Sequence, residues 1–368
     1  MINSQTQKGG ESSTNIQAQQ MVVHVGIDEK RAREIYQEMN LQLRSDYSEE
    51  ALKLANLRVS EFEQKLMPKI TQVEGALEAF ADPSFQLLLV EAQKTAASTE
   101  RPADYDLLSE LLIHRFQKGE NRIARAGISL AVEIVDKVAD DALLGLTVRH
   151  ALDSFIPYTG DIQEGLDVLD GLFGKLLYRD LPVGQEWLDH LDVLDAVRIN
   201  GYGSLKKVEQ YYPIALSGYI DVGIEKDSAN HQMAIDILKG QRLPVNILVE
   251  HALNSSYLRL RVCHRDSIDR LSLATQVIQN GIVSPVQQEL SKEQKQAIHS
   301  VYELYSRDEG ARQANVREFL EQWDKRSSLK ILRAWWDNIP VAFSVTSVGK
   351  ILAHSNAQRC DKNLPPLD

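Results

Sequence analysis

The chain has 368 residues, of which 43% are hydrophobic and 25% are charged, and its formal net charge is -11. This is a globular composition, sufficient for one large core or two, and its acidity argues against broad non-specific attraction to nucleic acid or to an anionic membrane. The two cysteines, Cys263 and Cys360, lie too far apart in sequence for a disulfide framework or a CxxC metal site. The sequence lacks a signal segment and any run of about 18 apolar residues. We therefore expect a cytoplasmic protein without a membrane span.

Residues 1–27 read as an extended leader and not as helix. Between Ile16 and Val25, alternate positions follow the two-residue period of a strand. Asn and Gln side chains, strand propensity, little charge and the absence of proline give this segment the profile of a cross-β segment. A flexible leader or a single edge strand is the alternative interpretation. The residues predicted to carry self-association are Asn15, Ile16, Gln17, Ala18, Val22 and Val23.

Residues 28–199 are predicted to form an N-terminal helical domain. Ser48 is placed to cap a helix that Pro68 interrupts, and Asp82 followed by Pro83 is typical of a helix start. Asp161 with Glu164 forms the pattern of a capping box. The helical apolar faces in this half are predicted at Leu52, Ala55, Val59, Phe62 and Leu66, at Phe85, Leu88, Leu89 and Ala92, at Ile123, Gly127, Leu130, Ile134 and Val138, at Leu166, Leu169, Phe173 and Leu176, and at Trp187, Leu188, Leu191 and Leu194.

A cluster of chain-breaking residues at 200–203 is the predicted domain boundary. Residues 200–368 are predicted to form a mostly helical C-terminal domain, with helices over 244–260 and 291–305. A further helix carries Trp335 and Trp336 and is followed by a short strand over 341–345 and a last helix. The predicted fold class is all-α, with a multi-helix bundle-like body, a short N-terminal β segment and a small C-terminal winged-helix-like strand and helix.

Clusters of acidic and histidine residues give no metal signature. Two acidic series, at Glu164, Asp167 and Asp170 and at Asp189, Asp192 and Asp195, fall opposite the apolar faces of their helices and are interpreted as solvated faces. Cys263 beside His264 lacks the spacing of a zinc site. We therefore expect no metal and no cofactor.

Two nucleic-acid functions are the alternatives. Arg259 and His264 resemble the Arg-x4–6-His pair of HEPN ribonucleases, which implies that His264 acts as a general acid or base on RNA and Arg259 steadies the phosphate. The other interpretation of this pair is a surface arginine and a core-flanking histidine. Residues 343–350 resemble the strand-to-helix ending of winged-helix DNA-binding domains. Between residues 307 and 336, seven Lys or Arg and five Asp or Glu nearly balance, so nucleic acid is not the expected partner.

The whole chain resembles a family of uncharacterised bacterial helical proteins. The leader with its Ile-Gln-Ala sequence and the C-terminal Thr-Ser-Val-Gly motif are part of the likeness, and residues 107–112 and 128–141 resemble helical abortive-infection proteins. The resemblance implies a phage-defence context by association. We therefore expect a non-enzymatic interaction protein that binds itself or another protein through the leader. The segments that carry the family resemblance are residues 9–18, 81–94, 201–205, 212–213 and 345–356.

Overall fold

The computed structural model describes residues 27–40, 48–118, 121–279 and 282–367, with the backbone alone for 273–279 and 282–286. The described part is mainly helical and its sheets have two or three strands, which confirms the predicted all-α class. The predicted leader strand lies outside the described residues. In the described part, no helix combines the length and the apolar character that a membrane crossing requires.

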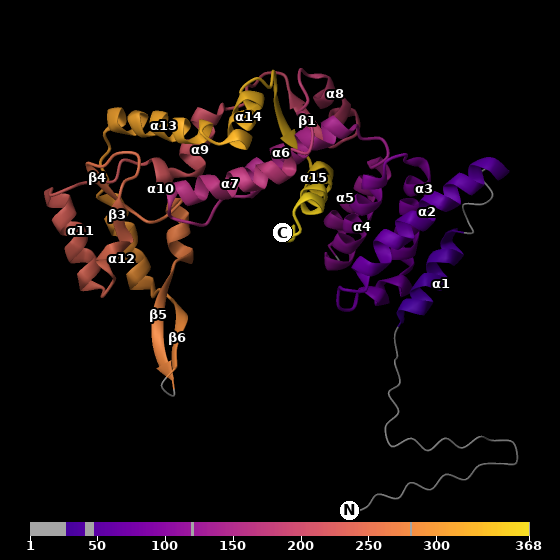
Figure 1. Cartoon of the computed structure of the whole chain (residues 1–368), viewed down its shortest axis with the longest axis horizontal. Helices are drawn as coiled ribbons and strands as arrows, with labels where there is room; N and C mark the ends of the chain where they lie inside the picture. Colours follow the sequence, from indigo (N-terminus) through magenta and orange to yellow (C-terminus); the bar gives the residue numbers. More distant parts are fainter. Residues whose placement is uncertain (1–26, 41–47, 119–120, 280–281, 368) are drawn as a thin grey trace, which may run out of the picture.

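Helices with local capping signals form the first half of the fold (Figure 1). Ser48 accepts a hydrogen bond from the amide of Ala51, and Asp82 accepts one from the amide of Ser84. Asp161 likewise caps the helix that follows it. These elements are α1 (Glu29–Asn40), α2 (Glu49–Ile70), η2 (Ala76–Ala81), α3 (Pro83–Ser98), α4 (Pro102–Gln117), α5 (Arg122–Ile134), α6 (Asp140–Ser154), α7 (Ile162–Leu176), α8 (Glu186–Val193) and β1 (Val197–Asn200).

Two details of this half differ from the prediction. Pro68 does not interrupt α2, which continues to Ile70. On α5, the side chains of Ile123 and Leu130 are 79% and 46% exposed instead of buried. The predicted face is correct at Gly127 and Ile134 and wrong at Ile123 and Leu130. The buried face of α5 consists of Gly127, Ile128, Ala131, Val132 and Ile134.

The second half contains more strand than predicted. The helix expected over 244–260 is wrong, because Leu258 and Leu260 alternate with arginines and pair as strand. The helix expected over 291–305 is confirmed with Ser291 as its cap. The elements are α9 (Val208–Ala215), α10 (Ser217–Ile220), β2 (Ile224–Glu225), α11 (Ala229–Gly240), η3 (Val245–Ile247), β3 (Leu248–Glu250), β4 (Tyr257–Leu260), η4 (Arg265–Arg270), β5 (Ser272–Gln279), β6 (Ile282–Glu289), α12 (Lys292–Glu303), α13 (Glu309–Asp324), α14 (Ser327–Trp336), β7 (Ala342–Val345) and α15 (Ser347–Cys360).

The end of the chain returns to its first half. Helix α15 packs against α4, α5 and α6, and β7 pairs antiparallel with β1 from Val197 opposite Val345 to Asn200 opposite Ala342. The boundary at residues 200–203 stays a prediction, but elements on either side of it share one hydrophobic cluster. This main cluster joins α1–α9 to α13–α15, whereas a smaller cluster lies among α11, α12 and the β2–β4–β3 sheet. The smaller cluster is built on Ile224, Ala234, Leu238, Leu260, Ile298 and Val301.

Candidate functional site

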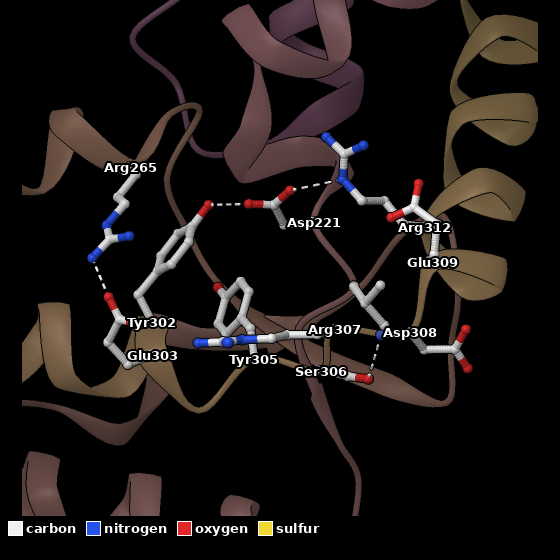
Figure 2. Close-up of a pocket in the computed structure, with 11 residues that line it drawn as sticks. Asp221, Arg265, Tyr302, Glu303, Tyr305, Ser306, Arg307, Asp308, Glu309 and Arg312 are labelled. Carbon is white, nitrogen blue, oxygen red and sulfur yellow. Dashed lines mark hydrogen bonds and ion pairs between the residues drawn. The ribbon is translucent and has the colours of Figure 1, made fainter.

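A polar pocket opens where the chain passes from the main hydrophobic cluster to the smaller one (Figure 2). It has a volume of about 320 Å³ and lies between the loop after α10, the start of η4 and the turn that joins α12 to α13. Its lining includes Asp221, Arg265, Tyr302, Tyr305, Arg307 and Arg312. We call it the Asp221 pocket.

Asp221 is the central acceptor of this pocket. The hydroxyl of Tyr302 donates to Asp221 Oδ2 at 2.7 Å, and Arg312 Nε donates to Asp221 Oδ1 at 3.3 Å (Figure 2). Burial, together with the neighbouring Asp221 charge, raises the pKa of Tyr302. The phenol is therefore a fixed proton donor to the carboxylate at neutral pH.

Stacked aromatic rings form one wall of the Asp221 pocket. The rings of Tyr302 and Tyr305 lie 4.3 Å apart at an angle of 16°. Arg265 places its guanidinium 5.5 Å from the Tyr302 ring and pairs with Glu303. The hydroxyl of Tyr305 accepts a hydrogen bond from the Leu260 amide at 2.6 Å, which ties α12 to β4. The wall is thus held rigidly from both sides.

Arg265 and Arg312 each form an ion pair, but the third arginine of the pocket, Arg307, does not. It is exposed and has no hydrogen bond or ion pair with another residue of the described chain. The described lining has three arginines against four carboxylates, so its charge is nearly balanced. Asp221 accepts from Tyr302 and Arg312, and Glu303 pairs with Arg265, so the arrangement does not favour nucleophilic chemistry.

Arg259 lies behind this pocket on β4 and not on a helix. Its side chain is 2% exposed, and its guanidinium donates to the carbonyl oxygens of Gly218, Leu260 and Val262 at 2.8–3.0 Å and to that of Gly160. Because the guanidinium is enclosed, it offers no exposed donor to an RNA phosphate. Arg259 instead connects three separate backbone segments.

His264, the predicted partner of Arg259, has a local structural role. Its Nδ1 accepts a hydrogen bond from the amide of Asp266 at 3.1 Å and so caps η4. This geometry does not favour the ribonuclease alternative, because one member of the pair is enclosed and the other is used as a cap.

A buried histidine cluster was missed by the sequence interpretation. His150 Nε2 lies 3.1 Å from His354 Nδ1, and His114 Nδ1 lies 3.1 Å from the hydroxyl of Ser355. Burial lowers the pKa of His150 to about 4 and also lowers the pKa of His114. The cluster joins α15 to α4 and α6. The available signal was the family-like segment 345–356, which contains His354 and Ser355.

The two acidic series have structural uses. Asp167 pairs with Arg326 at 2.7 Å, and Asp170 accepts a hydrogen bond from the Ser328 amide at 3.0 Å, so α7 holds the start of α14. Asp192 accepts one from the Ile199 amide at 3.3 Å. Across the described ranges, no group of three or more His, Cys, Asp or Glu side chains is arranged to hold a metal ion.

The C-terminal strand and helix, β7 and α15, and the helix α14 before them are built into the core. Trp335 and Trp336 are buried, and their indole N–H groups donate to the carbonyl oxygens of Pro182 and Lys206 at 2.8 and 2.7 Å. The predicted self-association residues fall within the leader and lie outside the described residues.

Comparison with known proteins gives a family without an assigned activity. No curated protein and no solved structure matches the chain. The sequence model of an uncharacterised family matches residues 26–365, so the match begins where the leader ends and includes the Asp221 pocket and the histidine cluster. The chain therefore belongs to this uncharacterised family.

Proposed function

We propose that the protein is a non-enzymatic interaction protein that associates with itself or docks a partner protein through its N-terminal leader. The observation that carries the proposal is the difference in charge between the leader and the rest of the chain. Residues 12–27 contain no Asp, Glu, Lys or Arg, whereas charged residues recur from Asp28 onward. Ile27, the last leader residue, packs against the main hydrophobic cluster. An uncharged, strand-prone segment thus leaves a folded body at a fixed point, as recognition by strand pairing requires.

The interiors of the described sites support binding over catalysis. Asp221 is occupied by Tyr302 and Arg312, and Arg259 is occupied by backbone carbonyls. The imidazoles of the histidine cluster are enclosed between helices. These groups hold the fold together, so we assign partner binding to the surface and the leader.

Light scattering during size-exclusion chromatography tests the role of the leader. The full chain and a chain without residues 1–27 are compared over a range of concentrations. We expect the mass of the full chain to rise above its 41.5 kDa monomer with concentration, and the shortened chain to stay monomeric. Equal oligomeric state and equal capture of partner proteins would overturn the proposal.

The cellular context proposed for this interaction is phage defence, which follows from the resemblance to abortive-infection proteins. Cells that carry the full-length gene, the leader-deleted gene or no gene are challenged with phage. We expect fewer plaques with the full-length gene alone. Equal plaque numbers in all three strains would remove the defence context and leave the interaction proposal to the light-scattering test.

A further inference from the structure

We propose that the leader of one copy adds as an extra strand to the outer edge of β5 in a second copy. This inference rests on the proposed function and names the surface that the leader binds. The hairpin of β5 and β6 projects from the end of the molecule that carries α11 and α12 (Figure 1). Its strands pair only with each other in the described structure. A two-stranded sheet is marginally stable in water, and a third strand stabilises it.

The register of the hairpin decides which edge is open. Residues of an antiparallel pair alternate between pointing both backbone polar groups at the partner strand and pointing both away from it. Pro285 has no N–H group, so a ladder accepts it where the backbone nitrogen points outward. Gln276 lies opposite Pro285, and therefore its N–H and C=O point outward from β5.

The same alternation makes the two edges unequal. On β5 the outward positions offer a complete row of donors and acceptors, whereas Pro285 removes one donor from the middle of the outer row of β6. A new strand therefore pairs better with β5. Residues 272–288 also contain no charged side chain, so no charge opposes the approach of an uncharged strand. The outward positions of β5 are Ser272, Ala274, Gln276 and Ile278.

The position of the leader favours a second copy as the source of the strand. The leader joins the body at Ile27 next to α1, and α1 and the hairpin occupy opposite ends of the long axis of the molecule (Figure 1). Pairing between copies joins one end of a chain to the other end of the next. A head-to-tail contact of this kind uses two different surfaces and produces rings or filaments.

Two full-length proline variants test the edge. Ala274→Pro removes an outward donor from β5, and Gln287→Pro removes the donor at the paired position on β6. We expect Ala274→Pro to weaken self-association by about tenfold or more, because one ladder hydrogen bond is lost and the facing carbonyl stays unpaired. The matched Gln287→Pro chain is expected to assemble like the wild type. Sedimentation velocity over a concentration series measures both.

Mixing two defective chains separates this inference from the proposed function. The full-length double variant Val22→Pro/Val23→Pro blocks the leader, because one of two consecutive residues faces the ladder in either register. Each of the Ala274→Pro and leader-blocked chains is expected to be monomeric alone at a concentration at which the wild type is just assembled. A mixture is expected to form a 1:1 complex, in which the intact leader of the first chain binds the open edge of the second.

The other possible results of these experiments overturn either the proposed function or this inference alone. If the leader-blocked chain assembles and captures partners like the wild type, the proposed function fails. If that chain is monomeric while Ala274→Pro assembles like the wild type, the leader binds elsewhere and this inference alone fails. A wild-type chain that stays monomeric at every concentration overturns the pairing between copies.

Discussion

Two buried histidines make the stability of the fold sensitive to mild acid. His150 is 4% exposed and His251 is 1% exposed, and burial lowers the pKa of each to about 4 from an ordinary value of 6.5. His150 contacts His354 and Ser154, and His251 Nε2 lies 3.0 Å from the carbonyl oxygen of Asp221. The neutral imidazoles are therefore part of the packed interior.

The size of the effect follows from proton linkage. Above pH 6.5 both histidines are neutral in the folded and unfolded states, and their contribution to stability is complete. As the pH falls from 6.5 to 4, the two imidazoles become protonated in the unfolded chain but stay largely neutral in the folded chain. The free energy of unfolding therefore decreases over this window. At pH 5 the loss is about 2 kcal/mol per histidine, or about 4 kcal/mol for the two. This is a large part of the roughly 5–15 kcal/mol that stabilises a typical domain.

Urea unfolding followed by circular dichroism at pH 7.5 and pH 5 measures this loss. We expect His150→Gln to lose about 2 kcal/mol less than the wild type between the two pH values, because one of the two groups no longer titrates. Phe155→Leu is the control, since the Phe155 ring lies 5.9 Å from that of His150 and its replacement alters packing without removing a titratable group. Phe155→Leu is expected to keep the wild-type pH dependence. If His150→Gln also keeps it, burial of this imidazole is not the cause and the reasoning is refuted.

Three further substitutions test the packing and the Asp221 pocket by urea unfolding at pH 7.5. Gly349→Ala places a Cβ in collision with the backbone oxygen of Ala196 and is expected to cost about 1–3 kcal/mol; an unchanged free energy of unfolding would show that α15 does not pack this closely. Asp221→Asn removes the charged acceptor of Tyr302 and is expected to cost about 1–3 kcal/mol, a prediction that wild-type stability would contradict. Arg259→Met removes the guanidinium from four carbonyl oxygens, of which only that of Leu260 keeps another donor, the Val262 amide, and is expected to cost about 2–4 kcal/mol, whereas a stable variant would mean that water replaces the guanidinium.

How far the sequence predicts this fold depends on the range of the interactions involved. Helix caps are local, and the signals at Ser48, Asp82 and Asp161 identified helix starts correctly because each cap binds an amide within three residues. The β5–β6 hairpin also has a local signal in the sequence, the Asn-Gly pair at 280–281 between two strand-prone runs, although the C-terminal half was predicted to be mostly helical.

The candidate site depends on contacts that no local pattern encodes. Asp221 meets Arg312 across 91 residues of sequence, and His150 meets His354 across 204. Neither pairing follows from periodicity or motif spacing, because the fold alone brings the partners together. The same is true of Arg259, whose burial follows from the close approach of the segments at Gly160 and Gly218.

The docking of α15 against α4–α6 has a consequence for how the protein folds during its synthesis. The N-terminal body cannot complete its core until the last helix has left the ribosome, because Ile351, Leu352 and His354 of α15 fill it. About 190 residues separate α6 from α15, and a ribosome makes such a stretch in roughly 10–40 s. During that time α4 and α6 expose apolar side chains that the finished protein hides. A chain that stops early, anywhere before α15, therefore carries an open core at its beginning and becomes a substrate for chaperones and proteases.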